Sequence, residues 1–140
     1  MAEIDRHRDY LIEAWEAAQA APLSAKKLML AALLADAYAD RLFAMQDETR
    51  DILAFRAGLA ARSAALAQVF ALVRGELRLV TEAVEVPLAD YGTLRVEDFM
   101  VSLYNDNTVQ RVRLVLPDGQ RVLAHPVVGE AVGYLSSASA

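Results

Sequence analysis

The strongest regular pattern in the sequence is an apolar stripe between residues 52 and 73. Its members are spaced 3, 4, 4, 3, 4 and 3 residues apart: Ile52, Phe55, Leu59, Ser63, Leu66, Phe70 and Val73. Such spacings place side chains on one face of an α-helix, so the segment is predicted to be a long amphipathic helix. Asp47 is the predicted cap at its start, although a helix continuous with the preceding one is an alternative. Gly75 is the predicted stop, because glycine readily adopts the left-handed conformation that ends many helices.

Two more helices are predicted upstream of this stripe. Residues 3–20 have apolar side chains at helical spacing, and Pro22 interrupts the pattern. Ser24 is the predicted cap of a second helix over residues 25–46. This helix is apolar on more than one side, because residues 28–35 read LMLAALLA. We therefore expect it to be the central helix of the domain, a contact between subunits, or both.

The character of the sequence changes after Gly75. Residues 77–86 are rich in β-branched side chains and predict a strand that stops before Pro87. Residues 96–104 have helical spacing, with a strand as the alternative. Residues 109–125 predict a β-hairpin.

The turn of this hairpin is Pro117-Asp118-Gly119, a sequence typical of a type I turn followed by a glycine bulge. A three-residue loop at this point predicts six cross-strand pairs: Leu116–Gln120, Val115–Arg121, Leu114–Val122, Arg113–Leu123, Val112–Ala124 and Arg111–His125. In this register one face of the hairpin is apolar and the other is basic. A slip of one residue would mix the two sets, so the alternation supports the register.

The whole chain is predicted to be one α+β domain over residues 1–140. A helical part, residues 1–75, would form a three-helix antiparallel unit. A mixed part, residues 76–135, would hold a small antiparallel β-sheet and a short C-terminal helix that opens at Pro126. Residues 136–140 are predicted to be a disordered tail.

Composition and charge narrow the range of partners. The 140 residues carry a net charge of −5, and neither the first 75 residues nor the rest has an excess of basic side chains. Binding to a phosphate backbone requires such an excess, so we expect no nucleic-acid partner. The longest apolar run, residues 28–35, is far shorter than the roughly 20 residues that cross a membrane, so we expect no membrane insertion. Residues 26–37 resemble a signal peptide but follow a helix-patterned segment, so we expect no cleavage there.

The basic face of the hairpin is the main candidate binding site. Guanidinium groups bind carboxylate or phosphate through paired hydrogen bonds, so a cluster of arginines predicts an anion site. The candidate ligand-binding residues are Arg111, Arg113, Arg121 and His125, with Tyr104 and Asn105 as candidate orienting groups. The alternative is a solvated or partner-covered face, in which acids such as Glu82 or Glu85 on a neighbouring strand pair with the arginines.

Other groups of residues favour structural roles. Asp36 and Asp40 lie four apart, but a di-metal site between helices needs Glu-x-x-His pairs, so pairing with arginines such as Arg56 or Arg62 is favoured over metal binding. No serine lies in G-x-S-x-G, and no Walker or dinucleotide-binding loop is present. Four aromatic residues would line a pocket or, more commonly at their spacings, belong to the core or a subunit contact: Tyr10, Trp15, Tyr38 and Phe43.

These patterns favour a non-enzymatic interaction or regulatory protein that forms a homodimer or small oligomer through its apolar helices. A small-ligand-binding protein or modest enzyme that uses the basic face on an anionic molecule is the alternative. We expect no catalytic residue, metal or cofactor. The absence of cysteine suits the cytoplasm, and the bias toward alanine and arginine is common in bacteria with GC-rich genomes.

Overall fold

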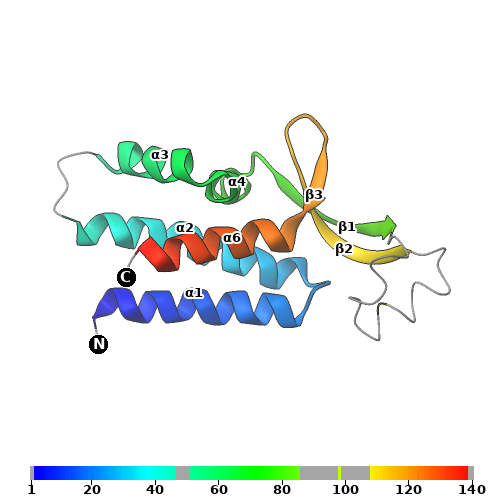
Figure 1. The fold of residues 1–140 in the computed structure, drawn as a ribbon, viewed down its shortest axis with the longest axis horizontal. Coiled ribbons are helices and arrows are strands. Elements are labelled where there is room, and N and C mark those ends of the chain that lie inside the picture. The colour runs from blue at the N-terminus through cyan, green and yellow to red at the C-terminus, as the bar shows by residue number, and fades with distance from the viewer. Residues whose placement is uncertain (1, 47–50, 86–97, 99–107, 139–140) are drawn as a thin grey trace.

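The computed structural model describes residues 2–46, 51–85, 98 and 108–138. Within these residues the chain has the expected α+β fold, with helices first, then an antiparallel sheet and a C-terminal helix (Figure 1). The elements are α1 (Glu3–Ala20), α2 (Ala25–Met45), α3 (Ile52–Arg62), α4 (Ala64–Val73), β1 (Arg78–Glu85), β2 (Thr108–Val115), β3 (Arg121–Leu123) and α6 (Ala124–Ala138). The ambiguous segment 96–104 lies outside the described residues apart from Asp98.

Helices α1 and α2 form an antiparallel pair, as the sequence predicts (Figure 1). The turn between them contains Pro22, and Ser24 caps α2 by accepting a hydrogen bond from the backbone N–H of Lys27 at 3.1 Å. This bond satisfies one of the N–H groups that a helix start leaves without a partner.

The prediction of one continuous third helix is wrong. The segment forms two helices, α3 and α4, which meet at Ser63. Ser63 has φ −138° and ψ 106°, and its hydroxyl accepts a hydrogen bond from the N–H of Leu66 at 3.2 Å. A serine that fits the helical spacing has therefore become a cap, since its side chain competes for backbone N–H groups. The cap at the start of α3 is Asp51, which accepts from Ala54 N–H at 2.7 Å. The predicted cap, Asp47, lies outside the described residues.

Gly75 ends α4 as predicted. Its φ is +85°, the N–H of Glu76 donates to the carbonyl of Ala71, and the N–H of Gly75 donates to the carbonyl of Leu72. This pair of bonds is the Schellman motif, which satisfies the last carbonyls of a helix and reverses the chain. The chain passes directly from this motif into β1.

The three strands pair in the order β1-β2-β3, with β2 in the middle. The hairpin has its predicted register, because Leu114 pairs with Val122, and Leu116 N–H donates to Gln120 O at 2.8 Å. The last two predicted pairs, Val112–Ala124 and Arg111–His125, do not form, since the chain leaves the sheet at Ala124 and enters α6. Strand β3 is therefore shorter than β2 and leaves one edge of residues 108–112 without a strand neighbour among the described residues.

Helix α6 differs from the expected C-terminal helix at both ends. It begins at Ala124, before Pro126, and it continues through residues 136–138, which were expected to lie in a disordered tail. Ser136 does not break the helix, because its hydroxyl donates back to the carbonyl of Val132 at 2.8 Å. Leu135 is fully buried near this end, so packing against the other helices favours the extra turn.

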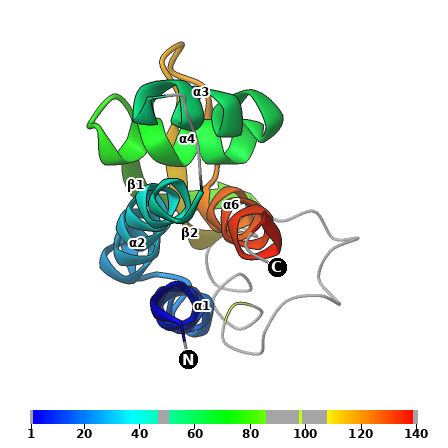
Figure 2. The same ribbon diagram turned by 90° about the vertical axis from the view of Figure 1, so that its left-hand side faces the viewer.

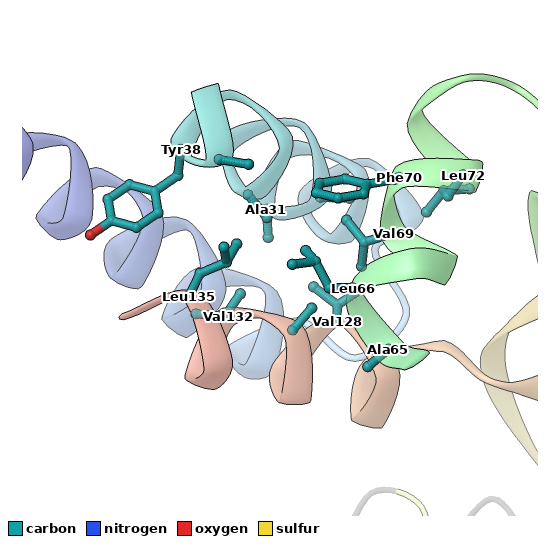
Figure 3. Close-up of a cluster of buried hydrophobic side chains, with 14 of the residues drawn as sticks. Ala31, Tyr38, Ala65, Leu66, Val69, Phe70, Leu72, Val128, Val132 and Leu135 are labelled. Carbon is teal, nitrogen blue, oxygen red and sulfur yellow. The ribbon is translucent and has the colours of Figure 1, made fainter. Parts of the chain in front are cut away.

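Helix α2 is the central helix, as its apolar sequence predicts. It packs against α1, α3, α4 and α6 and touches β1, and Figure 2 shows α1, α4 and α6 around it. Figure 3 shows how side chains of α4 and α6 meet those of α2. Its buried residues are Leu28, Ala31, Ala32, Ala35, Tyr38, Ala39 and Leu42. The alanines allow the neighbouring helix axes to approach closely, while burial of each leucine contributes about 1.5–3 kcal/mol.

Candidate functional site

Two of the candidate arginines, Arg113 and Arg121, bind the same carboxylate. Glu82 accepts hydrogen bonds from Arg113 Nη1 at 3.0 Å and from Arg121 Nη1 at 2.7 Å. Glu82 lies on β1 opposite Arg111, so its carboxylate reaches across the sheet to a diagonal neighbour, which long side chains can do. The alternative in which Glu82 pairs with the arginines is therefore the arrangement observed.

Arg113 also stabilises the edge of the sheet. Its Nη2 donates to the backbone carbonyl of Arg121 at 2.8 Å, while its Nε is buried and has no hydrogen-bond partner in the described part of the chain. The guanidinium thus joins β1, β2 and β3 through one carboxylate and one carbonyl. These bonds give Arg113 and Arg121 a structural role on this face.

Arg111 has different partners from the other two arginines. Its Nη2 donates to Asp98 Oδ2 at 2.9 Å, and its Nη1 donates to the backbone carbonyl of Gln110 at 2.8 Å. The guanidinium and the carboxylate are both about three-quarters covered, with exposed side-chain fractions of 23% and 22%. Arg111 belongs to the part of β2, residues 108–112, that has no pairing with β3.

His125 lies on α6 and not on the hairpin. Its Nε2 is 3.2 Å from the carbonyl oxygen of Ala18 near the end of α1. A carbonyl only accepts hydrogen bonds, so Nε2 carries the proton and the ring links α1 to α6. Burial lowers the pKa of His125 below its usual 6.5, and the positive charge of Arg111 lowers it further, while the bond to Ala18 acts in the opposite direction. These shifts favour the uncharged form of the ring.

Arg111 and His125 meet at one cavity, which has a volume of about 410 Å³. Its walls come from the end of α1, the open edge of β2 and the junction between β3 and α6. The lining residues are Trp15, Gln19, Pro22, Arg111, Val112, Leu123, His125 and Pro126. Of the candidate residues, Arg113 and Arg121 are not in this lining, and Tyr104 and Asn105 lie outside the described residues.

Trp15 forms the aromatic wall of this cavity. Its ring centroid lies 6.3 Å from that of His125, and the ring also lies beside Gly129 of α6. A Cβ atom on Gly129 would lie 2.5 Å from Trp15 Cζ2, so only glycine leaves room for the indole at this position. The sequence names Trp15 among the aromatic residues expected in a pocket, in the core or at a subunit contact. It gives no local signal for His125 and Gly129, which lie 110 or more positions away.

The acidic pair on α2 is also used internally. Arg56 of α3 donates to Asp40 Oδ1 at 2.8 Å and to Asp36 Oδ1, and its guanidinium carbon lies 4.1 Å from the ring centroid of Phe70. Arg62, the other arginine considered for this role, donates to the carbonyl of Gly58 at 3.2 Å. Among the described residues, no three His, Asp or Glu side chains are grouped as ligands of one metal ion.

The outer side of α2 has an apolar surface that the fold leaves in contact with solvent. Leu30 is 52% exposed and Leu33 is 45% exposed, and Ala37 and Ala44 are also exposed. These four residues follow one another at intervals of three, four and seven, so they lie on one face of the helix. We refer to Leu30, Leu33, Ala37 and Ala44 as the outer stripe of α2.

Comparisons of the chain with known protein families, curated proteins and solved structures found no match. None of the described helices is both long enough and apolar enough to cross a membrane.

Proposed function

We propose that the chain is a non-enzymatic interaction module that acts as a homodimer joined through the outer stripe of α2. The observation that carries this proposal is the exposure of Leu30 and Leu33 on α2, the described helix that contributes the most residues to the core. Apolar side chains at this spacing are typical of helix surfaces that pack against another helix. The cysteine-free, alanine-rich and arginine-rich composition supports a setting in the bacterial cytoplasm.

The charges along α2 favour an antiparallel pair of these helices. Lys26 and Lys27 lie in its first turn, and both are exposed. Asp40 lies seven residues after Leu33, and Lys26 lies seven residues before it. A two-fold axis at Leu33 would therefore place the lysines of one copy beside Asp40 of the other, as flanking charges do in coiled coils.

The exposed area sets the expected strength of the dimer. Each half-exposed leucine would gain about 1 kcal/mol on burial, so the four leucines of two copies supply about 4 kcal/mol. Association itself costs at least that amount in lost translational and rotational freedom, so the flanking charges and alanine contacts must supply the surplus. We therefore expect reversible association in the high micromolar range.

The test is light scattering coupled to size exclusion over roughly 10–500 µM protein. The molar mass of the wild type should rise from the 15.3 kDa of one chain toward twice that value. Leu33→Glu should remain a single chain throughout, because it places two carboxylates together at the axis. Leu53→Glu is the matched control, because Leu53 is a 76% exposed leucine on α3 and this variant should associate like the wild type.

The antiparallel arrangement has its own test. The double variant Lys26→Glu, Lys27→Glu should weaken association, because acids would then face Asp40 of the partner. A wild-type mass that stays at one chain up to the highest concentration would overturn the proposed dimer. Undiminished association of the double-lysine variant would overturn the antiparallel arrangement.

A further inference from the structure

The cavity between α1, β2 and α6 has the features of a binding site that is independent of the outer stripe of α2. Its volume of about 410 Å³ falls in the usual range of small-ligand sites, roughly 300–1,000 Å³. Most of its wall is apolar, and only a few polar groups converge on it. That combination is typical of sites in which apolar contacts give affinity and a few polar groups give orientation.

The apolar wall is held in place before any ligand arrives. The indole of Trp15 fills the space beside Gly129 of α6, where a Cβ atom would lie 2.5 Å from Cζ2. Pro22 and Pro126 add rigid rings to the lining, and Leu123, also in the lining, is 42% exposed. A flat aromatic group could therefore stack against Trp15 with little loss of side-chain freedom on binding.

The polar wall limits the charge of a ligand. Arg111 uses two of its five N–H groups in the bonds to Asp98 and to the carbonyl of Gln110, so it retains donors for a further acceptor. Burial and, to a smaller extent, Arg111 lower the pKa of His125, which favours its uncharged form. With one cation in the lining and that cation already paired, the site suits a single negative charge better than a phosphate or other dianion.

We propose that this cavity binds a small aromatic monocarboxylate, with the ring against Trp15 and the carboxylate on Arg111. Arg113 and Arg121 are not part of the site, since both are bound to Glu82 outside the cavity. Of the basic residues that the sequence suggests, Arg111 and His125 therefore belong to the site. The ring of Trp15 completes it.

The test uses 2-naphthoate and its neutral isostere 2-naphthamide as probes. Trp15 is the single tryptophan of the chain, so its indole N–H gives one distinct signal in a ¹H–¹⁵N NMR spectrum and reports directly on the cavity. Titration with 2-naphthoate should shift that signal with a Kd below about 1 mM, and 2-naphthamide should bind at least tenfold more weakly. A tenfold preference corresponds to about 1.4 kcal/mol for the charged contact.

Variants on β2 separate the proposed contact from the general charge of the sheet. Arg111→Gln should weaken 2-naphthoate binding at least tenfold and leave 2-naphthamide binding within twofold. Arg113→Gln is the matched control, because Arg113 lies two residues away on the same strand and should retain wild-type affinity for both probes. If Arg111→Gln fails to fold, Leu123→Glu at the rim should weaken 2-naphthoate at least fivefold and leave 2-naphthamide unchanged.

Three results would overturn the proposal. The first is no shift of the Trp15 signal by either probe at 5 mM, roughly five times the expected upper limit of Kd. The second is equal binding of the two probes, because the cavity would then recognise aromatic surface alone. The third is equal loss of 2-naphthoate affinity in Arg111→Gln and Arg113→Gln, because the effect would then come from the charge of the sheet.

Discussion

His125 couples the stability of the protein to pH. Its pKa is below the usual 6.5 in the folded chain, mainly because of burial, so the unfolded chain takes up a proton at a pH where the folded chain does not. Stability must then fall as the pH drops through 6.5, and the loss is complete once folded His125 is itself protonated. Arg111 and the carbonyl of Ala18 are the charged and polar groups that act on the ring.

We predict that His125→Gln reduces this pH dependence. Glutamine retains an N–H that can donate to the Ala18 carbonyl, but it does not titrate. The Tm of the wild type should fall between pH 7 and pH 5 by more than that of the variant, because carboxylates titrate equally in both proteins. Thermal unfolding followed by circular dichroism at several pH values would check this, and parallel profiles would show that His125 does not contribute.

The contact between α1 and α6 requires glycine at position 129, where Trp15 occupies the space of a side chain. A Cβ on Gly129 would lie 2.5 Å from Trp15 Cζ2 and 2.9 Å from Cη2, whereas a Cβ on Gly133 of the same helix would have nothing within 4 Å. The first position is closed by a rigid ring and the second is open. The two glycines thus form a matched pair on a single helix.

We predict opposite effects for alanine at these two positions. Gly129→Ala should lower the free energy of unfolding by about 1–3 kcal/mol, because the indole or the helix must shift. Gly133→Ala should raise it by about 0.5–1 kcal/mol, because alanine loses less conformational entropy than glycine in a helix. Urea denaturation of both variants measures the difference, and a loss of stability in Gly133→Ala would contradict the assigned packing.

Local sequence signals predict the elements well wherever a single signal acts. Ser24, Gly75 and Gly119 have backbone roles that follow from residue chemistry alone, and the structure confirms all three. The sequence predicts an uninterrupted helix at Ser63, and that prediction is wrong because two signals compete there. Its spacing fits the apolar stripe, while its hydroxyl favours a cap, and in the structure the hydroxyl caps α4 by accepting from the N–H of Leu66.

The candidate site was harder to predict, because it depends on contacts between distant segments. The alternation along β2 predicts which side chains lie on the apolar face and which lie on the basic face. Acids on a neighbouring strand can also be expected to pair with the arginines. Which acid forms the pairs depends on the β1–β2 register, which selects Glu82. The meeting of Trp15 and His125 depends on how α1 docks on α6, and no spacing within either segment encodes that contact.

At the scale of the whole molecule, α3 is held by fewer buried side chains than α2, α4 and α6. Only Phe55 and Leu59 are buried on α3, whereas α2 has seven buried residues. Arg56 provides much of the remaining attachment, through Asp36 and Asp40 of α2 and the ring of Phe70 on α4. Elements with few buried apolar contacts open at a lower free energy than the whole protein.

We therefore predict that α3 opens as a separate unit in native-state hydrogen exchange, before α2 and α6 open together. Arg56→Ala should speed exchange of α3 and α6 alike by about 5- to 30-fold, equivalent to 1–2 kcal/mol, because both openings break its contacts. Gly129→Ala should speed only α6, because the opening of α3 leaves the Trp15–Gly129 contact in place. If Gly129→Ala speeds both helices equally, α3 opens only when the whole molecule unfolds.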